Sequence, residues 1–214
     1  MIQTDKIIFF DFDLTLTTWC TTGIYRIDKP AYPISNDINS DKDRVINFFE
    51  FLNNNGIKYY IITRGRIDNV KKHLPMVSRR QIYGSFSDDH IHNPYKIIEL
   101  YEKYDIEINK TVIQMMLDDN LTKNKIRNVW AYFKCDIICK IIKDNNYDKS
   151  KVLFLDDTPV NVNIATIEYN INSVLIKPFK IEKYFIGNVQ TTISHAMKFL
   201  NIKERKIKNN KLYL

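Results

Sequence analysis

Residues 7–17, with the sequence IIFFDFDLTLT, place two carboxylates directly after a run of four apolar residues. An apolar run of this length is typical of a buried strand, and Asp11 and Asp13 stand where that strand should end. Ligands of open α/β sheets bind at the carboxyl ends of the strands. Two desolvated carboxylates repel each other there unless a cation lies beside them. Because oxygen ligands suit Mg²⁺, the stretch predicts a metal–carboxylate site.

This segment has two other interpretations. Asp and Thr are common in turns, so the segment is also compatible with an ordinary turn. A calcium loop would have the pattern Asp-x-Asp-x-Asp-Gly. Thr15 and Leu16 occupy the positions of its third Asp and its Gly, which argues against a calcium loop.

Length and composition predict one globular domain. The chain has 214 residues, of which 44% are hydrophobic, enough for a substantial core. It contains no apolar run of about 18 residues and no secretory signal, so we expect no membrane partner. Cys20, Cys135 and Cys139 form no Cys-x-x-Cys pair, which favours a reducing compartment. We therefore expect an intracellular protein, cytoplasmic or nuclear.

The charge of the chain favours anionic ligands. The formal net charge is +7, and residues 203–214 form a basic tail. Such a charge attracts phosphorylated or polyanionic partners over long distances. Contact with nucleic acid is one interpretation of the tail, and a solvated chain end is the other.

Apolar periodicity alternates between strand and helix along most of the chain. Strands are predicted at 6–11, 57–62, 81–86, 112–117, 152–155 and 173–176. Helices are predicted at 42–55, 66–74, 93–104, 124–144, 160–170 and 189–201, with irregular structure at 17–41. This alternation predicts an α/β, Rossmann-like parallel sheet with helices on both faces. We expect one domain over 1–214, with a small inserted lobe at about 78–110 and the basic tail at 203–214.

Three predicted strands end in polar residues. Asp11 and Asp13 follow the first strand, Thr63 follows the second, and Asp156 and Asp157 follow the strand at 152–155. Because the carboxyl ends of parallel strands meet at one edge of a sheet, these side chains should lie close together.

These motifs resemble those of the haloacid dehalogenase-like (HAD) phosphohydrolase superfamily. Its first motif, Asp-x-Asp-x-Thr, corresponds to residues 11–15, its second to Thr63, and its fourth to Asp156-Asp157. The following Thr158-Pro159-x-Asn161 resembles the magnesium-dependent and C-terminal-domain-type phosphatases. A dehalogenase would lack the second acid of the first motif, which is present here as Asp13.

The resemblance implies a role for each motif residue. Asp11 would be the nucleophile that forms an aspartyl-phosphate, and Asp13 would be the general acid and base. Thr63 would donate a hydrogen bond to a phosphoryl oxygen. Mg²⁺ would be held by Asp11, the backbone carbonyl of Asp13, Asp156 and Asp157.

The family also has a lysine that contacts the nucleophile and the phosphate. It usually begins the helix before the fourth-motif strand, which favours Lys125, with Lys123 and Lys96 as alternatives. A second acidic pair, Asp118-Asp119, also follows an apolar run. We assign the fourth motif to Asp156-Asp157 because the chain after it supplies a further helix and strand.

The sequence therefore predicts a magnesium-dependent phosphatase that hydrolyses a phosphate monoester. Because 17–41 is short and irregular, we expect an open site and a macromolecular phosphate, on a protein or a nucleic-acid end, rather than a small metabolite. Two alternatives remain: a phosphomutase-type phosphotransferase, and a catalytically silent protein that keeps the fold for binding or scaffolding.

Overall fold

Five parallel strands form the central sheet, in the order β3-β2-β1-β4-β5. They are β1 (Ile7–Phe10), β2 (Lys58–Arg66), β3 (Ile82–Ser85), β4 (Val152–Asp156) and β5 (Ser173–Leu175). The computed structural model describes residues 4–17, 37–87, 89–90, 93–118, 122–181 and 184–202. The parallel pairing and strand order confirm the predicted α/β, Rossmann-like sheet.

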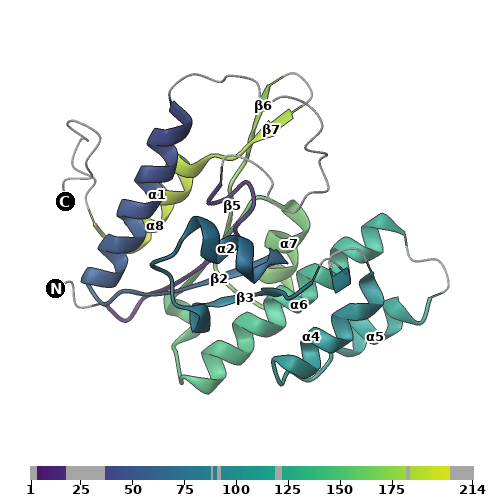
Figure 1. Cartoon of the computed structure of the whole chain (residues 1–214). Helices are drawn as coiled ribbons and strands as arrows, with labels where there is room; N and C mark the ends of the chain where they lie inside the picture. Colours follow the sequence, from purple (N-terminus) through teal and green to yellow (C-terminus); the bar gives the residue numbers. More distant parts are fainter. Residues whose placement is uncertain are drawn as a thin grey trace.

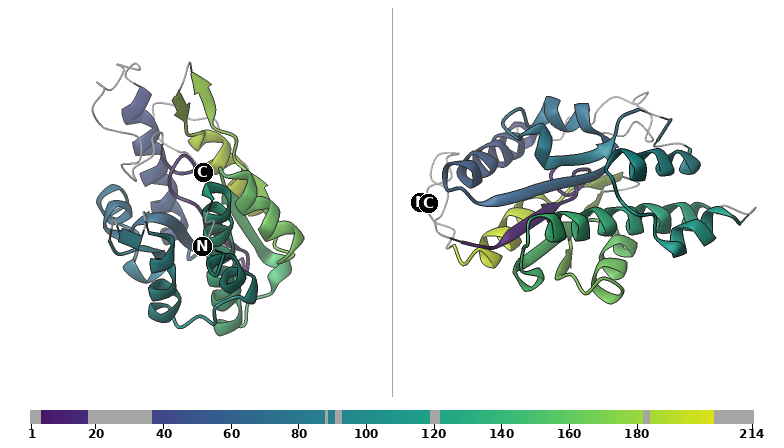
Figure 2. Two further views of the ribbon diagram at one scale, coloured as in Figure 1. Left: turned by 90° about the vertical axis from the view of Figure 1, so that its right-hand side faces the viewer. Right: turned by 90° about the horizontal axis from the view of Figure 1, so that it is seen from below.

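Helices cover both faces of this sheet (Figure 1). One face is packed by α1 (Asp37–Asn54), α2 (Ile67–His73) and α8 (Val189–Phe199). The other is packed by α4 (Ile97–Lys103), α5 (Lys110–Met116), α6 (Lys123–Asp144) and α7 (Pro159–Ile167). Single 3₁₀ turns lie at Arg79–Gln81, Pro94–Lys96 and Lys149–Lys151. Figure 2 shows the sheet between the two helical layers.

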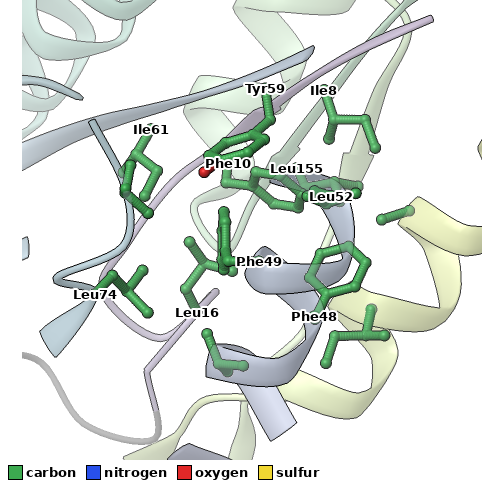
Figure 3. Packing of buried hydrophobic residues seen from close by; sticks show 14 of the residues in the cluster. Ile8, Phe10, Leu16, Phe48, Phe49, Leu52, Tyr59, Ile61, Leu74 and Leu155 are labelled. Atoms are coloured by element: carbon green, nitrogen blue, oxygen red, sulfur yellow. The ribbon is translucent and has the colours of Figure 1, made fainter. Parts of the chain in front are cut away.

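Strand β1 is buried on both faces, as its unbroken apolar run predicts. Ile8 and Phe10 belong to the core cluster under α1, and Ile7 and Phe9 belong to the cluster under α6. The ring of Phe10 lies 5.5 Å from that of Phe49 on α1, within the packing drawn in Figure 3. Because both faces are tightly packed, the end of β1 has a fixed position.

Strand order also determines where a site can form. Going along the chain, β2 and β3 are added on one side of β1, whereas β4 and β5 are added on the other. The order therefore reverses between β1 and β4. In open α/β sheets, ligands bind in the crevice outside the strand ends at such a switch point. Asp11 directly follows β1, and Asp156 is the last residue of β4.

The strand predicted at 112–117 is wrong, because residues 112–116 belong to α5 and Leu117 caps its end. The Asn109 side chain caps this helix by accepting a hydrogen bond from the backbone N–H of Thr111. Val112 and Met116 are buried, whereas Ile113 and Leu117 are 43% and 77% exposed. That burial pattern has the period of a helix, and the apolar side chains on the exposed face obscured it in the sequence.

The inserted lobe expected at 78–110 contributes directly to the main structure. Its strand β3 is the edge strand of the sheet, and Leu100 and Tyr101 of α4 belong to the core under α6. A further feature that we did not predict is the antiparallel hairpin of β6 (Phe179–Ile181) and β7 (Tyr184–Ile186).

Other expectations fall outside the described residues. These are Cys20, Asp119, the tail 203–214 and most of the irregular segment, residues 18–36. Among the helices that the structure describes, none combines the length and apolarity needed to cross a membrane.

Candidate active site

Asp11 and Asp156 lie side by side at the switch point between β1 and β4. The backbone N–H of Asp11 donates to the carbonyl of Leu155 at 2.8 Å, which extends the pairing of the two strands by one residue. Both carboxylates are buried, at 4% and 0% exposure. Burial of two like charges is unfavourable unless a cation compensates them.

Lys134, from the middle of α6, supplies that cation. Its Nζ donates to Asp11 Oδ1 at 2.6 Å and to Asp156 Oδ2 at 2.7 Å. Burial alone would lower the pKa of Lys134, but attraction to the two carboxylates outweighs it and raises the pKa. Lys134 is therefore protonated, and one ammonium group holds both acids in position.

Asp156 is oriented further by donors that follow it in the chain. The Asn161 side-chain amide lies 2.9 Å from both of its oxygens, and the backbone N–H of Thr158 donates to Oδ1 at 2.8 Å. These contacts give a structural reason for the Thr158-Pro159-x-Asn161 pattern. Pro159 begins α7 and places Asn161 within reach of the carboxylate.

Asp157 completes a group of three carboxylates. One oxygen from each of Asp11, Asp156 and Asp157 lies within 4.8 Å of the others. With Lys134, the group has three negative charges and one positive charge, so two negative charges remain uncompensated. Burial, followed by repulsion from Asp156, raises the pKa of Asp157 to about 7. Burial likewise raises the pKa of Asp11 well above its usual value.

This donor set fits a divalent cation. All the side-chain ligand atoms are carboxylate oxygens, which Mg²⁺ prefers, and two positive charges would balance the group. Because their pKa values are raised, Asp11 and Asp157 take up a proton more readily than free carboxyl groups do. The carboxylate of Asp13 is not among the three that converge, which is compatible with the backbone-carbonyl role implied for it.

Thr63 lies in a local irregularity of β2. The pairing of β2 with β3 shifts register between Ile62 and Arg66, and such bulges re-aim side chains near active sites. Thr63 is buried, and its Oγ1 accepts a hydrogen bond from the backbone N–H of Gly65 at 2.9 Å. Because that contact uses the oxygen as an acceptor, the hydroxyl proton can be donated to a ligand.

The turn that follows Asp11 packs against the C-terminal part of the chain. Leu14 has a φ of 59°, a conformation that is unfavourable for a leucine. The Thr192 hydroxyl on α8 donates to the carbonyl of Thr15 at 2.7 Å. Gly187 packs so closely that an added Cβ would lie 2.0 Å from the carbonyl oxygen of Thr17. Asp13, in this turn, is partly exposed and lies close enough to His73 to affect its pKa.

Lys134 contacts the two carboxylates, whereas the lysines expected from the sequence lie elsewhere. Lys125 instead forms an ion pair with Asp118, near the start of α6, and Lys96 pairs with Glu99 on the surface. Lys123, the other alternative, is the first residue of α6 and is exposed.

The position of Lys134 follows from the length of α6. At about 1.5 Å per residue, its 22 residues span about 33 Å, roughly twice the length of the five-residue strand β4. The helix therefore starts well beyond the strand ends, and a residue near its middle reaches them. A signal was present in the sequence: Lys134 is the single charged residue in the buried run from Val129 to Cys135. A buried lysine in such a run requires carboxylate partners.

Comparison with known proteins found one similar solved structure. It is the crystal structure of yhjK, a haloacid dehalogenase-like hydrolase protein from Bacillus subtilis. The match covers 96% of this chain and 93% of that chain, with 11% sequence identity and a TM-score of 0.48. No protein-family model and no curated protein matched the sequence. The assignment of the fold class rests on the strand order and pairing of this chain.

Proposed function

We propose that this protein is a Mg²⁺-dependent phosphatase that hydrolyses a phosphate monoester through an aspartyl-phosphate on Asp11. The observation that carries this proposal is the contact of Lys134 Nζ with both Asp11 and Asp156 at the switch point of the sheet. A purely structural ion pair would not need the third carboxylate of Asp157 beside it. The motif resemblance to HAD phosphohydrolases supports the same chemistry.

The two oxygens of Asp11 have different surroundings, which suggests the reacting atom. Lys134 donates to Oδ1 at 2.6 Å, whereas the hydrogen bond that Oδ2 accepts from the Thr15 hydroxyl is long, at 3.5 Å. Oδ2 would attack phosphorus, forming an O–P bond while the bond from phosphorus to the leaving oxygen breaks. Lys134 favours the ionised form of Asp11, opposing the effect of burial on its pKa, and holds the carboxylate in a fixed orientation.

Two further residues complete the reaction. Asp13 would give its proton to the leaving oxygen and then take a proton from the water that hydrolyses the aspartyl-phosphate. The Thr63 hydroxyl would donate to a phosphoryl oxygen. Bound Mg²⁺, held by Asp11, Asp156, Asp157 and the Asp13 carbonyl, would offset repulsion between the carboxylates and the phosphoryl group.

The test is phosphate release from an aryl phosphate with Mg²⁺, combined with trapping of the phosphorylated protein. Asp11→Asn should abolish both turnover and labelling, whereas Asp13→Asn should slow turnover and leave Asp11 as the labelled residue. Asp148→Asn is a matched control, because Asp148 is an exposed cap of a 3₁₀ turn. Substantial turnover in purified Asp11→Asn would rule out the covalent mechanism. Transfer to a second sugar phosphate rather than to water would indicate a phosphomutase.

We also propose that the physiological substrate is a macromolecular phosphate ester. The net charge of +7 supports this, because it would attract a polyanion or phosphoprotein over long distances and the attraction would weaken with salt. A substrate panel at low and moderate salt, with the full chain and with a variant lacking 203–214, tests the proposal. Preference for one small metabolite, insensitive to salt and to that deletion, would reject it and leave the phosphatase proposal intact.

A further inference from the structure

Arg64, which directly follows Thr63, forms a cation–π pair with Trp130. The guanidinium carbon of Arg64 lies 5.6 Å from the centre of the Trp130 ring, in the geometry of a cation–π contact. The backbone of Arg64 is held in place as well, because the Ser85 hydroxyl donates to its carbonyl at 2.6 Å. The guanidinium therefore has a defined position on the α6 side of β2.

This pair is adjacent to the catalytic group. Arg64 follows Thr63 directly in β2, and β2 is paired with β1, the strand that ends at Asp11. Trp130 precedes Lys134 by four residues on α6, so it lies about one helical turn, or roughly 6 Å, from the residue that contacts Asp11. The connection of Arg64 to Thr63 and that of Trp130 to Lys134 both place the pair beside the carboxylate of Asp11. The pair lies on the side where α6 extends past the strand ends (Figure 2).

Trp130 contributes a second donor. Its ring is 3% exposed, and it packs edge-on against Phe133 at 5.5 Å. Its Nε1–H is buried and has no hydrogen-bond partner in the described part of the chain. Buried indole N–H groups usually donate to an acceptor. An indole N–H without an acceptor, next to a guanidinium, suggests that a ligand supplies the acceptor.

We propose that Arg64, supported by Trp130, binds a second phosphate on the leaving group of the substrate. This inference rests on the proposed phosphatase function and narrows its substrate class to esters with two phosphates close together. Lys134 is the cation that contacts the two carboxylates, and Arg64 adds a second positive charge on the neighbouring strand β2. A guanidinium presents paired N–H donors that match phosphate oxygens, and stacking on Trp130 reduces the conformational freedom lost on binding.

Binding can be measured without turnover in the Asp11→Asn protein with Mg²⁺. The probes are adenosine 3′,5′-bisphosphate and the two corresponding monophosphates, by calorimetry. We expect the bisphosphate to bind at least about tenfold more tightly than either monophosphate. In the Asp11→Asn background, Arg64→Gln should reduce that ratio to near one, and Trp130→Phe, which keeps a ring but lacks the N–H, should reduce it severalfold.

Arg66→Gln is the matched control, because Arg66 lies two residues further along β2 and contacts Asp68 at 3.7 Å. It should leave the ratio unchanged. Arg64→Lys keeps the charge but loses the paired donors, so it tests the geometry if Arg64→Gln does not fold. Equal binding of the bisphosphate and the monophosphates, or a ratio unaffected by both Arg64 variants, would overturn the inference.

A kinetic comparison separates this inference from the proposed function. In the otherwise unaltered enzyme, the ratio of kcat/KM for the bisphosphate to that for the monophosphates should fall about tenfold in Arg64→Gln. Phosphoserine tests whether a carboxylate can replace the second phosphate; a preference for it over the bisphosphate would overturn the phosphate assignment. Turnover of all esters without preference would reject the inference alone, whereas Arg64-dependent binding without any turnover would reject the phosphatase proposal alone.

Discussion

Lys134 Nζ lies 2.6 Å from Asp11 Oδ1 and 2.7 Å from Asp156 Oδ2, so one ammonium group joins the ends of the neighbouring strands β1 and β4. The contact links α6 to the sheet at the point where strand order reverses. Stability and the proposed chemistry therefore depend on the same side chain.

Lys134→Met should abolish activity and reduce the free energy of unfolding by about 3–5 kcal/mol at neutral pH, because it leaves buried carboxylates without their cation. The pKa of Asp11, already raised by burial, should rise further. The folded variant would then bind protons more readily than the unfolded chain. Its loss in free energy of unfolding, relative to the unaltered protein, should therefore become smaller as the pH falls towards 4.

Urea unfolding at pH 5 and pH 8 measures both effects. Lys125→Met is the matched control, because its ion pair with Asp118 is partly exposed at the start of the same helix. Lys125→Met should reduce the free energy of unfolding by at most about 1 kcal/mol. Equal losses in the two variants would contradict a special role for Lys134.

Asp157→Asn should stabilise the metal-free protein at pH 8 and remove its stabilisation by Mg²⁺. Burial and repulsion from Asp156 raise the pKa of Asp157 to about 7 from its ordinary value of 3.8. Between these values the folded state holds more protons than the unfolded state, so stability falls as the pH rises from about 4 to 7. Above pH 7 the penalty of the buried charge is fully present, and the amide removes it.

The same titration affects metal binding, because Mg²⁺ must displace the proton on Asp157. The Mg²⁺ affinity of the unaltered protein should fall by up to about tenfold per pH unit below pH 7. Calorimetry at pH 6, 7 and 8 measures this dependence, and thermal unfolding with and without Mg²⁺ measures the stabilisation. Mg²⁺ binding that is independent of pH, or retained in full by Asp157→Asn, would contradict the assignment.

Gly187→Ala should displace the turn that carries Asp13 and reduce activity strongly. An added Cβ would lie 2.0 Å from the carbonyl oxygen of Thr17 and 2.7 Å from that of Leu14, so backbone must move. Gly56→Ala is a useful comparison, because Gly56 has a φ of 69° but nothing within 4 Å of an added Cβ. It should cost only about 1 kcal/mol of stability and leave activity intact. Urea unfolding and kcat/KM distinguish the variants, and full activity in Gly187→Ala would show that the turn tolerates displacement.

Asp136→Asn should destabilise the helical layer without changing the affinity for Mg²⁺. The hydroxyls of Tyr101 and Tyr169 donate to the two Asp136 oxygens at 2.7 Å and 2.6 Å. An amide accepts only one of these bonds, so the loss should be about 1–3 kcal/mol. Asp144→Asn, on the exposed end of α6, is the control and should have little effect. Reduced Mg²⁺ affinity in Asp136→Asn would show that the two regions are coupled.

The sequence by itself determined the fold class and the strand-end acids. An unbroken apolar run followed by Asp11 and Asp13 is a local pattern, and so is the run that ends in Asp156 and Asp157. Parallel strands bring their carboxyl ends to one edge whatever the lengths of their connections, so the sequence alone predicts the grouping of Asp11, Asp156 and Asp157. Thr63 is expected at that edge for the same reason, and in the structure it lies within β2, whose last residue is Arg66.

Only the tertiary structure decided which lysine contacts the acids at the strand ends. The distance that α6 extends past the sheet depends on how it packs, and a helix position alone does not reveal which residue lies level with the strand ends. The structure selects Lys134 because it lies on the buried face at that level, whereas Lys125 lies near the outer end. Tertiary packing likewise made residues 110–116 a helix, since burial of Val112 and Met116 against α6 outweighed the strand propensity of a short apolar run.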